Sequence, residues 1–224
     1  MHQRKSKKIL FYIFLFLIFS TIGNESLNNL KFDNIENIQI SGLGDKNSNI
    51  LQEKLKNLNF KKNIFFLNKE EIEKLLSSNT LIETYEIYKN YPASLNIKIK
   101  KTTFFAKINR NGKTFLIGSN GKLTLDNLNH SDLPFIFGKP NIKEFINFKK
   151  NLDSSNFLYS DIKNFYFFPS KRWDLKFKNN TLLKLPYNVS PEILKRVYEF
   201  LENYSNENYA VIDARINNQI ILNE

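Results

Sequence analysis

The sequence lacks cysteine and contains only two histidines, His2 and His130, which lie far apart. The absence of cysteine excludes disulfide bonds, thiolate zinc sites and cysteine nucleophiles. Two distant histidines provide almost no material for a histidine metal site or a Ser-His-Asp relay. The composition therefore disfavours an enzyme, and we expect no catalytic residues, no metal and no cofactor.

Acidic residues are also in the minority, with 22 Asp and Glu against 33 Lys and Arg, which gives a formal net charge of +11 over 224 residues. A basic cluster lies within residues 4–8, whereas the other lysines are interspersed with acidic residues. No basic helix or RNA-binding aromatic motif accompanies this charge. We therefore expect neither nucleic acid nor a small-molecule substrate.

A single long apolar run lies near the start of the chain. The basic residues 1–8 precede Ile9 to Ile22, which are fourteen uncharged and mostly apolar residues. A helix of this length spans roughly 21 Å, short of a ~30 Å hydrocarbon core unless flanking residues help. We interpret residues 9–23 as an uncleaved transmembrane signal-anchor of the inner membrane, with a cytoplasmic tail and a periplasmic bulk. The alternative is cleavage after Gly23, which would release a soluble binding protein or enzyme.

After a polar linker at residues 24–34, the patterns predict a small domain over residues 35–101. A strand in IENIQISGL is followed by a helix with Asn47 or Ser48 as N-cap and by a second helix with Asn68 and Glu71 in capping-box positions. Two alternating runs on either side of Tyr91-Pro92 then predict a hairpin. The predicted order is β-α-α-β-β.

Residues 102–224 are dominated by short alternating runs separated by turn signals such as Asn111-Gly112 and Asn120-Gly121. In WDLKF, Trp173 alternates with polar residues in the way of a core residue. Helical spacing is found over residues 142–152 and after Ser190, an N-cap followed by proline. We predict an α+β protein whose second domain is a mostly antiparallel β domain with two helices.

The C-terminal residues raise a question about a sheet edge. Residues 210–216 alternate as a half-buried strand, Asn217-Asn218 supplies a turn, and Gln219 to Asn223 form a returning strand. An open edge strand invites pairing with another chain, so such an edge is either covered or used for binding.

Several stretches, in this order and spacing, carry a resemblance to a known family: IQISGL, KNIFFLN, YPASLNIKIKKTTFFAKI, LPFIFGKP, RWDLKFKNNTLLKLP and VIDARI. Together with the basic tail and apolar segment, they resemble the FtsQ/DivIB family of bacterial division proteins. The resemblance implies a single-pass inner-membrane protein with a POTRA domain followed by a β domain. It also implies a non-catalytic scaffold of the divisome at the septum, which binds FtsB-like and FtsL-like proteins and links early to late division proteins.

The resemblance further implies that a partner adds a strand at the C-terminal edge and that Arg215 meets an acidic partner residue. The expected partner-binding residues are Arg215, Ile216, Gln219, Ile220, Ile221 and Leu222. A plainer alternative is that Asp213 and Arg215 pair with each other at the surface, where ion pairs contribute little.

Overall fold

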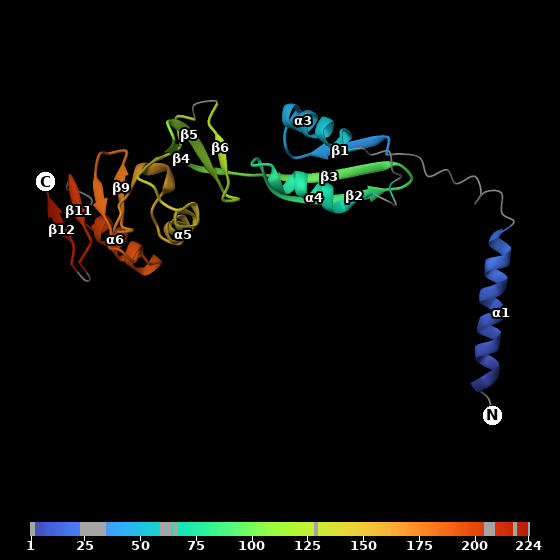
Figure 1. Ribbon diagram of the computed structural model, residues 1–224. Helices are drawn as coiled ribbons and strands as arrows, with labels where there is room; N and C mark the ends of the chain where they lie inside the picture. The colour runs from blue at the N-terminus through green and yellow to red at the C-terminus, as the bar shows by residue number, and fades with distance from the viewer. Residues whose placement is uncertain are drawn as a thin grey trace. The chain divides into compact units, whose positions relative to one another are not determined.

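The computed structural model (Figure 1) describes residues 3–22, 35–58, 64, 67–127, 130–203, 209–216 and 219–223. The chain divides into two compact units. One comprises Met1–Ser41, Asp45–Ile72 and Glu86–Lys98, and the other comprises Gly42–Gly44, Glu73–Tyr85 and Ile99–Glu224. The predicted linker at residues 24–34 and the predicted turn at Asn217-Asn218 lie outside the described residues.

The apolar run near the N-terminus is helical, as predicted, within α1 (Gln3–Ile22). Large apolar side chains on this helix are exposed, including Ile9 at 58% and Phe16 at 73%. Within the described parts of the chain, no helix combines the length and the apolar character that crossing a membrane requires. The predicted transmembrane span of residues 9–23 is therefore not supported, because its uncharged part is fourteen residues and a spanning helix needs ~20.

A three-stranded sheet with two helices follows. Its elements are β1 (Asn37–Ser41), α3 (Asp45–Lys56), α4 (Lys69–Ser78), β2 (Ile82–Asn90) and β3 (Ser94–Lys101). The strand order is β1-β3-β2, with β1 parallel to β3. The buried side chains include Leu51 and Leu55 from α3, Ile72 from α4, and Leu95 and Ile97 from β3. The predicted β-α-α-β-β order is confirmed.

The second sheet has nine strands in the order β12-β11-β10-β9-β8-β7-β4-β5-β6. In chain order these are β4 (Phe104–Arg110), β5 (Lys113–Gly118), β6 (Leu123–Leu125), β7 (Phe135–Phe137), β8 (Ile162–Phe167), β9 (Trp173–Phe177), β10 (Leu182–Lys184), β11 (Val211–Asp213) and β12 (Ile221–Asn223). The pairs β4–β7, β7–β8 and β10–β11 are parallel, and the other pairs are antiparallel. The mostly antiparallel sheet was predicted, but the parallel pairs were not.

One face of this sheet, the core face, is covered by α5 (Ile142–Asp153) and α6 (Pro191–Asn203). The short 3₁₀ helix η2 (Tyr159–Asp161) leads into β8. A continuous row of residues paired in register forms the core face: Ile136, Phe165, Leu175, Leu183, Ile212 and Leu222. Trp173 is 5% exposed and stacks on Phe148 at a ring distance of 4.9 Å, so it is a core residue as its alternation predicted. The alternate residues of the same strands form the opposite, outer face.

Candidate functional site

The C-terminal strand β12 lies at one end of the nine-stranded sheet, next to β11 (Figure 1). The two strands pair antiparallel, with Val211 opposite Asn223 and Asp213 opposite Ile221. No strand of the described chain pairs with the other side of β12. The observed strand, Ile221–Asn223, is shorter than the predicted one, which began at Gln219.

The orientation of β11 shows which peptide group of β12 faces the open side. The Ala210 carbonyl accepts a hydrogen bond from the Leu182 N–H at 2.9 Å, and the Ala214 N–H donates to the Lys184 carbonyl at 2.9 Å, so these two groups face β10. The Ala210 N–H donates to the Asn223 carbonyl at 3.0 Å, on the β12 side. Alternate residues of a strand direct their peptide groups to opposite sides, so Val211 and Asp213 face β12. Their partners Asn223 and Ile221 are thereby turned inward. The N–H and C=O of Leu222, between them, are directed to the open edge.

The side chains of β12 divide between the two faces of the sheet. Leu222 continues the core row and is half-buried against the hydrophobic core. Ile221 lies on the outer face opposite Asp213 and is 43% exposed. An incoming strand would therefore contact Ile221 on the outer face of the sheet and Leu222 on the core face.

A cavity of about 440 Å³ lies beside this strand, between α6 and the segment that connects β11 to β12. Its lining is mostly apolar and consists of Pro186, Ile193, Arg196, Val197, Phe200, Ala214, Ile216, Gln219 and Ile220. Three of the predicted site residues, Ile216, Gln219 and Ile220, are brought together here. Ile216 is 54% exposed at this cavity. The residues of α6 were absent from the predicted site, although their helical spacing marks one face of that helix.

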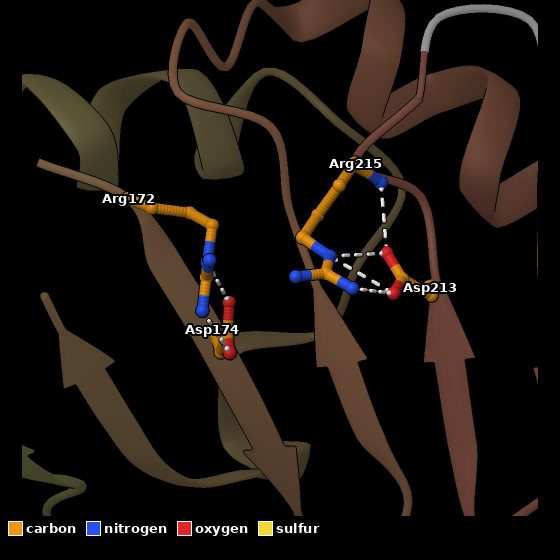
Figure 2. Close-up of polar contacts among 4 residues, drawn as sticks. All are labelled: Arg172, Asp174, Asp213 and Arg215. Carbon is orange, nitrogen blue, oxygen red and sulfur yellow. Dashed lines mark hydrogen bonds and ion pairs between the residues drawn. The ribbon is translucent and has the colours of Figure 1, made fainter. Parts of the chain in front are cut away.

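Arg215 pairs with Asp213 (Figure 2), which is the plainer of the two sequence interpretations. The guanidinium Nε lies 2.8 Å from Oδ1 and 2.9 Å from Oδ2 of Asp213, and the backbone N–H of Arg215 donates to Oδ1 at 3.1 Å. These hydrogen bonds hold the pKa of Asp213 below its usual range and raise the pKa of Arg215. The Arg215 side chain remains 45% exposed. The pair fixes the chain where it leaves β11 and approaches the cavity.

A second ion pair lies at the start of β9, which is separated from β11 by β10. The Arg172 Nε donates to Asp174 at 3.0 Å, and Figure 2 shows this pair next to the Arg215 pair. Asp174 is only 3% exposed. Burial raises the pKa of Asp174, and the hydrogen bond from Arg172 opposes that shift. Lys184 lies in register between Asp174 and Asp213, so charges of alternating sign cross β9, β10 and β11 on the outer face.

These features suit recognition of a polypeptide. Within the described residues, no group of three or more His, Cys, Asp or Glu side chains is arranged to hold a metal ion. Of the predicted site residues, Ile216, Gln219 and Ile220 line one apolar cavity and Ile221 and Leu222 lie on the edge strand, whereas Arg215 is in neither set. An open backbone edge supplies hydrogen bonds to a partner, and a neighbouring cavity discriminates among its side chains.

Two family models match the chain. The model described as "POTRA domain, FtsQ-type" matches residues 34–101, and the model described as "Cell division protein FtsQ/DivIB, C-terminal" matches residues 99–215. A curated relative, "Cell division protein DivIB" of Clostridium botulinum (strain Loch Maree / Type A3), is 32% identical over 126 residues. That match covers 54% of this chain and 47% of the relative, so the chain matches about half of the relative's length.

A solved structure was also found by comparison of folds. It is the major extracytoplasmic domain of the trans isomer of the bacterial cell division protein DivIB from Geobacillus stearothermophilus. The alignment has a TM-score of 0.32 and 13% sequence identity, and it covers 47% of this chain and 89% of that chain.

Proposed function

The chain belongs to the FtsQ/DivIB family of cell division proteins, and from this membership we propose that it serves septation as a non-catalytic scaffold. In this role it binds FtsB-like and FtsL-like division proteins at the septum and links early to late steps of division. Binding, and no chemical step, is the activity that the site geometry supports.

The open side of β12 is the observation that carries this proposal. A segment of the partner adds to the sheet as a further strand and bonds to the N–H and C=O of Leu222. The cavity between α6 and the β11–β12 connection then receives an apolar side chain of the same segment. Its volume of about 440 Å³ lies within the usual range for pockets that enclose a ligand group.

Arg215 has a double role in this proposal. An arginine has five N–H donors, and the bonds to Asp213 involve Nε and one Nη. Arg215 therefore fixes the connection after β11 through Asp213 and directs its remaining donors to a partner carboxylate. The partner contact is secondary to the internal pair, because Asp213 already neutralises much of the charge.

Attachment to the membrane is assigned to α1. Helices that are apolar all round are typical of segments surrounded by lipid or by protein. Large apolar side chains of α1 are exposed from Ile9 to Phe19. Because the uncharged run alone is too short to cross the hydrocarbon core, this proposal requires flanking residues to complete the span, with the basic N-terminus in the cytoplasm and the folded regions on the other side.

Binding of the full chain to the organism's own FtsB-like and FtsL-like proteins tests the proposed function. The decisive pair of variants is Leu222→Pro and Leu222→Ala, since both shorten the side chain and only proline removes the N–H. We expect Leu222→Pro to weaken binding at least ~10-fold more than Leu222→Ala does, because only the first loses a main-chain hydrogen bond. Circular dichroism spectra of both variants check that the fold is kept.

Equal binding by the two Leu222 variants would remove the strand edge from the interface. No binding by the wild-type chain would refute the partner assignment itself. In that case the released soluble protein, our alternative from the sequence, becomes the better hypothesis.

A further inference from the structure

The outer face of the nine-stranded sheet carries a group of aromatic rings away from the C-terminal edge. We call this group the aromatic patch, and it consists of Phe135, Phe137, Tyr166 and Phe168 on β7, β8 and the turn after β8. Phe137 is opposite Tyr166 in register, and their rings stack at 5.0 Å with an interplanar angle of 11°. Phe135 contacts Phe137 at a ring distance of 4.9 Å. Phe137 is 44% exposed although its ring packs against both neighbouring rings.

The backbone places Phe137 and Tyr166 together without a partner. Gly138 directly follows Phe137 and has a φ of +99°, and a Cβ there would lie 2.2 Å from the Phe167 carbonyl oxygen. The chain thus leaves β7 in close contact with β8, which keeps the Phe137 ring over Tyr166. Rings that are ordered in advance lose little conformational entropy when a partner covers them.

Positive charge surrounds the aromatic patch. Lys107 is opposite Phe135 in register, and Arg172 lies over the Phe168 ring at 4.3 Å. The same two rows of the outer face continue to Lys176 and Lys184. Both carboxylates within these rows are paired with an arginine, Asp174 with Arg172 at 3.0 Å and Asp213 with Arg215 at 2.8 Å. Exposed aromatic residues and arginine are the types most enriched where proteins bind one another.

We propose that the aromatic patch is a second interaction surface, which binds an acidic segment of a protein partner through one large apolar side chain. The apolar side chain lies on Phe137 and Tyr166, and the carboxylates face Lys107, Lys176 and Lys184. A protein is favoured over a lipid surface because the rings lie packed along the sheet, whereas binding to a bilayer needs side chains that insert below its surface. The surface acts independently of strand addition at β12.

Fluorescence anisotropy with labelled synthetic peptides tests this assignment on the full chain. One probe peptide contains glutamate, leucine and a single tryptophan, and the second has every glutamate replaced by lysine. We expect the acidic peptide to bind more tightly than the basic one, and Phe137→Ala to weaken its binding by ~10-fold or more. Lys107→Glu should also weaken it, without removing any ring from the patch.

Matched controls distinguish binding at the aromatic patch from non-specific binding to exposed apolar side chains and from binding at the C-terminal edge. Leu125 on β6 is as exposed as Phe137, at 44%, so Leu125→Ala removes a comparable apolar group and should leave binding unchanged. Leu222→Pro should also leave it unchanged, which distinguishes failure of this proposal from failure of strand addition. Equal binding of both peptides, or equal effects of Leu125→Ala and Phe137→Ala, would overturn the proposal. Binding to phosphatidylglycerol vesicles that depends on Phe137, with none to the acidic peptide, would replace the protein partner with a lipid.

Discussion

Arg215 and Asp213 form a two-pronged ion pair at the end of β11, with the arginine Nε 2.8 Å and 2.9 Å from the two carboxylate oxygens. The backbone N–H of Arg215 adds a third hydrogen bond to the same carboxylate. The pair therefore orders the chain at the entrance to the proposed binding site. A residue that the family resemblance assigned to a partner is thus also part of the internal structure.

Removing each member of this pair separates the two roles of Arg215. We expect Arg215→Ala to weaken partner binding more than Asp213→Ala does, because only the first also removes donors directed to the partner. The double variant should bind about as weakly as Arg215→Ala alone, since the two side chains share one interaction. Titration of the FtsB-like partner by calorimetry measures all three variants. Identical losses for the two single variants would limit Arg215 to ordering the chain.

The same pair predicts how stability depends on pH. Because Arg215 lowers the pKa of Asp213 in the folded chain, this contribution is complete above the unfolded pKa of ~3.9 and is lost as the pH falls through the lower folded value. The difference in Tm between wild type and Arg215→Ala should therefore be constant near neutral pH and narrow in strong acid. Asp174, whose pKa is raised by burial, changes stability with the opposite sign, and only the part of its effect that does not involve Arg215 is common to both proteins and cancels in the difference. A difference that stays constant down to strong acid would contradict this reading.

If the partner occupies the cavity beside β12, a substitution in the cavity lining should lower partner affinity and leave the fold intact. Ile216→Ala removes an apolar group that is 54% exposed at the cavity. We expect partner affinity to fall by ~10-fold, as for other apolar anchors, while Tm changes little. Leu158→Ala is the matched control, because Leu158 is 64% exposed and is absent from the cavity lining. Equal affinities for the two variants would exclude the cavity from the interface.

The proposed attachment through α1 predicts an intact N-terminus. N-terminal sequencing of the mature protein should find the residues before Ile9, and the protein should stay with the membrane fraction after alkaline carbonate extraction. Phe16 is 73% exposed on α1, so Phe16→Asp should increase the extracted fraction by placing a charge among apolar side chains. A mature protein that begins at Asn24 in the soluble fraction would instead support release by cleavage.

Local patterns in the sequence predicted most of the elements and much of the core, although α3 begins at Asp45, before the predicted N-cap at Asn47 or Ser48. The alternation in WDLKF placed Trp173 in the core, where its ring stacks on Phe148. Ser190 and Pro191 marked the start of α6, and the Ile193 N–H donates to the Ser190 hydroxyl at 3.4 Å. Such signals succeed because capping and burial depend on neighbours along the chain.

The order in which the strands pair across the sheet could not be predicted from such local patterns. Strand β7 lies between β4 and β8 through parallel pairing, and alternation within a strand does not specify its neighbours. The contribution of α6 to the cavity depends on that tertiary packing, so Arg196 and Phe200 were missed. Asp174 alternates with apolar residues as a solvent-facing residue would, yet it is buried beneath its partner Arg172.

Leu222 belongs both to the open edge, through its peptide group, and to the core row, through its side chain. In the proposed complex, folding and partner binding are consequently linked by mass action. A partner at ~100 times its dissociation constant stabilises the folded chain by ~2.7 kcal/mol. Without a partner, we expect β12 to fray and to open the end of the core row to proteases. The cellular amount of this protein should then follow the supply of its partner, which gives the cell a means of removing copies that have not assembled.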